Sequence, residues 1–131
     1  MFERLRNGTS GDRRRETLRE IAAALVLHSQ LEEEYFYPAI DACGDLEGAQ
    51  LVADARSAHA DIDDLIERLL AMDARGAELE RAVVELDRNV RRHVRDEEAR
   101  LFPVAERLLG AGRLDEIGRA IQARRARLAA A

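Results

Sequence analysis

The chain has 131 residues, enough for one domain with a hydrophobic core, and 47% of them are hydrophobic against 36% charged. The net charge of −5 gives no reason to expect nucleic-acid binding, and the single cysteine, Cys43, excludes an internal disulfide. No apolar run is long enough to span a membrane and no signal-peptide core is visible, so we expect a soluble protein of the cytoplasm, without membrane or nucleic-acid partners.

Alanine, leucine, arginine and glutamate dominate and β-branched runs are absent, so the composition predicts an all-α fold. After a short amphipathic segment (residues 1–5) and a turn (residues 7–11), a long helix is expected over about residues 12–40. Its inward face is defined by residues spaced alternately three and four positions apart, as in a heptad repeat. The inward positions are Leu18, Ile21, Leu25, His28, Glu32, Tyr35 and Ala39.

Two further long helices are expected over about residues 46–75 and 77–109, and glycines lie in each connection. His59 lies on the inward face of the first, and His93 and Glu97 lie on the inward face of the second. Gly110 and Gly112 should break the chain before a last helix at about residues 112–130. Short loops between long helices predict an antiparallel up-down bundle: one domain, residues 1–131, with its core in residues 1–109.

One motif occurs twice in this chain. His28-Ser-Gln-Leu-Glu32-Glu33 precedes Tyr37-Pro38, and His93-Val-Arg-Asp-Glu97-Glu98 precedes Phe102-Pro103. Residues four apart share one face of a helix, so each copy presents an imidazole beside a carboxylate. His28 and His93 lie equally deep in their helices and His59 lies near the middle of its own. Five donors should therefore meet at one level: His28, Glu32, His59, His93 and Glu97.

Carboxylates on an inward face are costly to bury unless they are paired or bind a cation. Mixed imidazole and carboxylate ligands suit iron, manganese or zinc, and carboxylates that can bridge favour a pair of metal ions. The alternative is a buried network of histidine and glutamate side chains that holds no metal.

The order of these motifs resembles the hemerythrin-like, or HHE cation-binding, family. The resemblance implies a four-helix bundle with a non-heme di-iron centre, in which His28, His59 and His93 are terminal ligands and Glu32 and Glu97 are bridges. It also implies that the protein binds or senses dioxygen or peroxide, or senses iron. We expect a binding or sensing protein. The alternatives are a peroxide-decomposing or oxidase-like enzyme, and a regulatory or structural bundle whose metal site is partial, mononuclear or absent.

Members of that family open with a helix that carries another histidine, and residues 1–5 resemble only the end of it. We therefore expect either a histidine-bearing segment upstream of Met1 or a site with one ligand fewer. Such a site would hold a single metal ion, or two metal ions with unequal numbers of protein ligands, completed by water. An incomplete first helix would expose one face of the bundle, which either the last helix or a second copy in a homodimer should cover; of the two we favour the homodimer. Tyr35 is interpreted as an inward core residue, Glu33 and Glu98 as neighbours of the ligands, and Asp63 as solvated.

Overall fold

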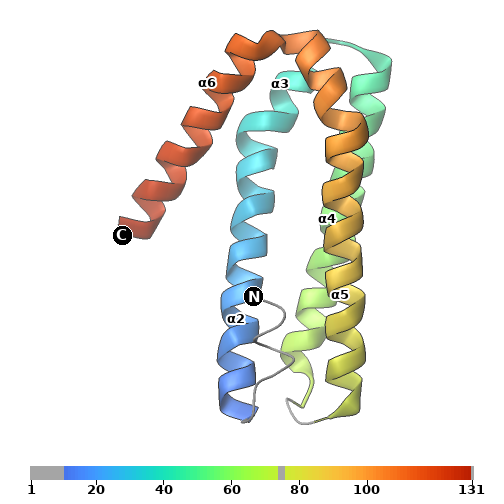
Figure 1. Cartoon of the computed structure of the whole chain (residues 1–131), viewed down its shortest axis with the longest axis vertical. Helices are drawn as coiled ribbons and strands as arrows, with labels where there is room; N and C mark the ends of the chain where they lie inside the picture. The colour runs from blue at the N-terminus through green and yellow to red at the C-terminus, as the bar shows by residue number, and fades with distance from the viewer. Residues whose placement is uncertain (1–10, 74–75, 131) are drawn as a thin grey trace.

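The computed structural model describes residues 11–73 and 76–130, and its regular elements there are all helical (Figure 1). The chain runs up, down and up again in long antiparallel helices, which confirms the predicted all-α bundle. In chain order the elements are α2 (Gly11–Leu31), the π-helical turn η1 (Glu32–Phe36), α3 (Tyr37–Asp41), α4 (Leu46–Ala71), α5 (Ala77–Asp96), the π-helical turn η2 (Glu97–Leu101) and α6 (Phe102–Ala130). The predicted incomplete first helix, residues 1–5, lies outside the described residues.

The two π-helical turns occupy the same place in the two copies of the motif. Each begins at the glutamate that follows the histidine and ends just before the aromatic-proline pair. The amide of Tyr37 donates to the carbonyl of Glu32, five residues back, and the amide of Phe102 donates likewise to Glu97. A proline has no amide hydrogen, and its ring collides with the carbonyl four residues earlier in a regular α-helix. A widened turn relieves that collision, so the prolines give a local reason for both π-helical turns.

A widened turn changes which residues face inward beyond it. The uniform heptad spacing predicted Tyr35 and Ala39 on the inward face, but both are only partly buried. Phe36, Tyr37 and Ile40 are buried instead. The predicted inward residues are therefore wrong after Glu32, because the π-helical turn inserts one extra residue into the helical period.

Two apolar clusters fill the bundle, one at each end. The cluster nearer the start of α2 consists of Leu18, Ile21, Ala22, Ile62, Leu65, Ile66, Leu69, Leu79, Ala82, Val83 and Leu86. The cluster at the other end consists of Phe36, Tyr37, Ile40, Leu51, Val52, Ala55, Leu101, Val104, Ala105 and Ile117. Buried polar side chains lie between the two clusters along the chain: Glu32, His59, His93 and Glu97. Apolar packing on both sides thus keeps this polar layer away from water.

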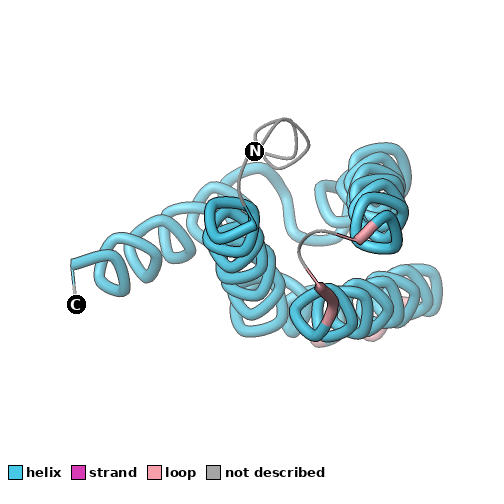
Figure 2. Tube along the Cα trace, turned by 90° about the horizontal axis from the view of Figure 1, so that it is seen from below, coloured by secondary structure: helices cyan, strands magenta, loops and turns pink. Residues whose placement is uncertain are grey.

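The last helix bends at Gly110, whose positive φ of 81° suits a residue without a side chain. Ile117 is buried after the bend, and Leu114 and Ile121 pack against the same cluster. Beyond them α6 extends away from the three long helices, as the end-on view shows (Figure 2). Within residues 11–73 and 76–130, no helix combines the length and apolar character needed to cross a membrane.

Candidate metal centre

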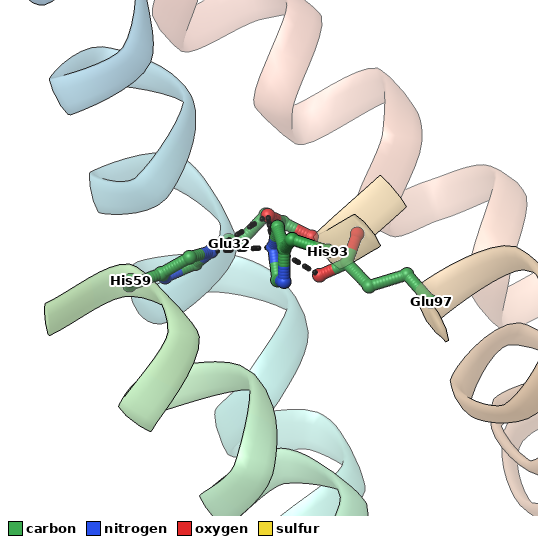
Figure 3. A group of neighbouring side chains, drawn as sticks. All are labelled: Glu32, His59, His93 and Glu97. Carbon is green, nitrogen blue, oxygen red and sulfur yellow. Dashed lines mark hydrogen bonds and ion pairs between the residues drawn. The ribbon is translucent and has the colours of Figure 1, made fainter. Parts of the chain in front are cut away.

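Four buried side chains meet between the three long helices (Figure 3). Glu32 comes from η1, His59 from α4, His93 from α5 and Glu97 from η2. Their exposed fractions are only 6%, 3%, 6% and 5%. One nitrogen or oxygen of each lies within 4.8 Å of those of the other three. The sequence predicted that these residues would share one level of the bundle, and the structure brings them together there.

The spacing of the four donor atoms resembles that of ligands around one ion. The Nε2 atoms of His59 and His93 lie 2.9 Å apart. Oε1 of Glu32 lies 3.3 Å from His59 Nε2 and 3.8 Å from His93 Nε2. Oε1 of Glu97 lies 3.1 Å from His93 Nε2. Ligands that bind one transition-metal ion at roughly 2.0–2.2 Å are themselves roughly 3–4 Å apart, so the donor set of two nitrogens and two oxygens fits such an ion.

His28 lies beside this cluster but is not buried in it. Its Nε2 atom lies 2.8 Å from Oε1 of Glu32, while 49% of its side chain is exposed. The sequence predicted an inward His28, and this part of the prediction is wrong. Among the described helices, α4 packs against α2 and leaves the His28 side of α2 open to solvent. His28 therefore contacts Glu32 from the solvent side, whereas His59 and His93 approach it from the interior.

Tyr37 is a member of the site that the sequence did not identify. It is completely buried, and its hydroxyl donates a 2.7 Å hydrogen bond to Oε1 of Glu97. The same hydroxyl lies 3.3 Å from Nε2 of His59, and the two rings stack at 5.5 Å. The sequence placed Tyr35 on the inward face as a core residue, but Tyr35 is only partly buried. Pro38 was the available signal, because a proline at that point indicates an irregular turn just before it.

One buried atom of the cluster, Nδ1 of His59, has no hydrogen-bond partner within the part of the chain that the structure describes. Leaving a buried polar atom unsatisfied costs roughly 1–3 kcal/mol. Oε1 of Glu32, by contrast, is the oxygen on which the Nε2 atoms of His28, His59 and His93 converge, at 2.8, 3.3 and 3.8 Å. A cation between the donors would be bound by the charge of Glu32 and by the imidazole lone pairs, so this convergence supports a metal site.

Without a cation, the imidazoles and carboxylates stabilise one another's charges. Burial opposes ionisation of Glu32, but the neighbouring imidazoles, His28 first, hold its pKa well below the ordinary value. Burial lowers the pKa of His93, but Glu32 and Glu97 outweigh it and raise this pKa to about 9. The Glu32 carboxylate also raises the pKa of His28. Burial, and then the nearby carboxylates, raise the pKa of Tyr37, so its hydroxyl stays protonated and remains a donor.

A sequence model of the hemerythrin HHE cation-binding domain matches residues 1–120. The chain belongs to the hemerythrin HHE family. Searches among curated proteins and among solved structures each returned no match. For a hemerythrin HHE domain, the buried cluster of two histidines and two glutamates fits a metal-binding site.

The remaining predicted neighbours of the hemerythrin HHE site lie outside the buried layer. Glu33 is exposed, with Oε2 3.9 Å from Nδ1 of His59, and Glu98 and Asp63 are also exposed. The roles of His28, Glu32, His59, His93 and Glu97 as metal ligands stay predictions, with four of these residues in one buried layer and the fifth at its edge.

Proposed function

We propose that this domain is a non-heme iron protein that binds or senses dioxygen or peroxide. The observation that carries the proposal is the buried layer of two imidazoles and two carboxylates contributed by three separate helices. Histidine with glutamate suits iron, with zinc or manganese as substitutes. Iron held by these residues would supply a redox-active Lewis acid able to bind a small ligand.

The proposed metal site is an unequal pair of ion positions. An inner position uses Glu32, His59, His93 and Glu97, which have the spacing of ligands to one ion. An outer position uses His28 and the shared carboxylate of Glu32, and water completes it, because His28 is half exposed. The inner ion should therefore bind tightly, and the outer ion weakly and exchangeably.

Other side chains hold this donor set in place. The hydroxyl of Tyr37 fixes one oxygen of Glu97, which orients the carboxylate toward His93. The two apolar clusters cover the layer at both ends, and the low local dielectric that they create strengthens attraction between a cation and the two carboxylates. These residues bind and orient, which suits a reversible binding or sensing role.

Metal analysis combined with an anomalous-scattering map tests the proposal. Purified protein should contain iron, with about one tightly held ion per chain and a second that a mild chelator removes. The map should place the tight ion among Glu32, His59, His93 and Glu97. Protein without metal after growth in iron-rich medium would reject the proposal and favour the metal-free network. Turnover of added peroxide would identify an enzyme, and reversible binding without turnover a sensor or carrier.

We also propose that two copies associate as a homodimer that shields the side of His28. A half-exposed imidazole at a metal site supports this arrangement, because ligands are normally protected from competing water. Light scattering of the metal-loaded protein at micromolar concentration should give twice the mass of one chain. A mass of one chain would reject the dimer and leave the metal site unaffected.

A further inference from the structure

A small cavity lies between α4 and the stretch formed by α5 and η2, on a side of the site that His28 does not line. Its volume is about 50 Å³. The inner wall includes His93 and Glu97, which are buried. The outer wall includes Asp54, Asp96 and Arg100, which are exposed. The cavity therefore leads from charged surface side chains to a histidine and a glutamate of the candidate metal site.

The size of the cavity limits what it can admit. One water molecule needs roughly 10–15 Å³ of such space, and cavities that bind benzene measure roughly 150 Å³. A volume of about 50 Å³ thus suits molecules of two or three non-hydrogen atoms and excludes aromatic compounds.

Two alanines on α4 create this space. Ala55 and Ala58 line the cavity, and both lie within one turn of His59. The inward positions farther along α4 carry large side chains such as Ile62 and Leu65, which fill the apolar cluster there. Small side chains thus occur on α4 at the level of the site, where a larger one would fill the cavity.

We propose that this cavity is the access route by which small, uncharged ligands of two or three atoms reach the site, and that Ala58 sets the size limit. The inference rests on the proposed iron site and adds the route of the ligand and the residue that limits its size. Asp54 and Asp96 at the outer wall disfavour anions, and Arg100 only partly offsets them. Ligands then enter from the α4 side, where His28 does not line the cavity.

Ala58→Leu tests the route, and Ala60→Leu is its matched control. Ala60 lies on the same helix but is exposed and does not line the cavity. Iron content and helical circular dichroism of all variants are measured first. Wild-type protein that contains no iron would reject the proposed function itself. Association of nitric oxide with the iron(II) protein is then followed by stopped-flow absorbance. We expect Ala58→Leu to slow association at least about tenfold, and Ala60→Leu to leave the rate unchanged.

Leu51→Ala should enlarge the cavity instead of filling it, because Leu51 also lines the cavity. The enlarged cavity should admit nitric oxide as fast as wild type or faster. Iron-loaded Ala58→Leu protein with a wild-type rate would overturn the route. Slower association in Leu51→Ala would overturn the size limit. Should Ala58→Leu fail to fold, Ala58→Val carries the same test with a smaller side chain.

Discussion

The two copies of the repeated motif form the same backbone turn, but their histidine and aromatic side chains differ in exposure to solvent. Both form a π-helical turn that starts at the glutamate, and both glutamates are buried. In the first copy the histidine is half exposed and the aromatic residue, Tyr37, is completely buried. In the second copy His93 is buried and Phe102 is 42% exposed. Local sequence therefore determines the turn, while neighbouring helices determine which side chains of the motif reach the interior.

The copies also depend on each other, because each completes the surroundings of the other's glutamate. Tyr37 of the first copy donates a hydrogen bond to Glu97 of the second. His93 of the second copy approaches Glu32 of the first at 3.8 Å. The site is therefore shared between the copies, but only the second supplies a buried histidine. If the inner ion position is the important one, equivalent substitutions in the two copies must have unequal effects.

The largest difference is expected between His93→Ala and His28→Ala. Loss of residues that merely support ligands costs roughly 10–100-fold in metal affinity, so loss of His93 itself should cost more and abolish tight binding. His28→Ala should remove only the weak ion, because this side chain is half exposed at the edge of the cluster. Metal titration with a competing chelator measures both. Near-wild-type metal retention in His93→Ala would contradict the assignment of the second copy.

The pH dependence of the metal-free protein should distinguish the same two histidines. The folded-state pKa of His93 is about 9, above its ordinary 6.5, so its stabilising contribution is complete below pH 6.5 and disappears as pH rises through 9. A shift of this size corresponds to about 3 kcal/mol. Urea unfolding across this window should show stability falling with pH in wild type and His28→Ala, but much less in His93→Ala. Equal slopes in all three proteins would contradict the prediction.

The metal-loaded protein should respond to pH in the opposite direction. Metal binding requires neutral imidazoles, so protons compete with the ion and acid should release it. The stability that the metal confers then rises with pH, whereas the stability of the metal-free protein falls. Metal content after dialysis at successively lower pH measures the release.

Tyr37→Phe and Phe102→Tyr form a matched pair with a smaller expected difference. Tyr37→Phe removes the hydrogen-bond donor from a buried carboxylate, which costs roughly 1–3 kcal/mol. Phe102→Tyr adds a hydroxyl at a partly exposed position and should change stability by less than about 0.5 kcal/mol. Thermal unfolding of the metal-free proteins compares them. Equal destabilisation would show that the aromatic positions of the two copies are equivalent after all.

The sequence was sufficient for the helices and for the level at which Glu32, His59, His93 and Glu97 meet. Repeated spacing and equal depth in antiparallel helices are properties of single helices, so they can be read without knowing the packing. The break at Gly110 was likewise predicted from residue type and is observed. The family resemblance rested on the same spacing and is confirmed.

The exposure of His28 and the burial of Tyr37 could not be predicted from the sequence and are known only from the structure. A helical pattern shows which residues share a face, but the solvent side of His28 depends on which helices pack beside α2. Tyr37 was missed because one extra residue in the π-helical turn rotates the rest of the helix. Pro38 indicates irregularity at that point, but a proline alone does not distinguish a π-helical turn from a kink or a helix end.

The smallest difference is expected between Glu33→Gln and Glu98→Gln, which change equivalent residues next to the buried glutamates. Oε2 of Glu33 lies 3.9 Å from Nδ1 of His59, a buried nitrogen without a hydrogen-bond partner among the described residues. A small shift of this exposed side chain would let it accept a hydrogen bond from Nδ1–H, which keeps the proton on Nδ1 and the lone pair of Nε2 directed at the cluster. Glu33→Gln should therefore weaken metal binding by up to about tenfold, and Glu98→Gln should have no effect. Chelator competition resolves a change of that size. An equal loss in both variants would point to the general loss of negative charge, and orientation of His59 by the first copy would then be rejected.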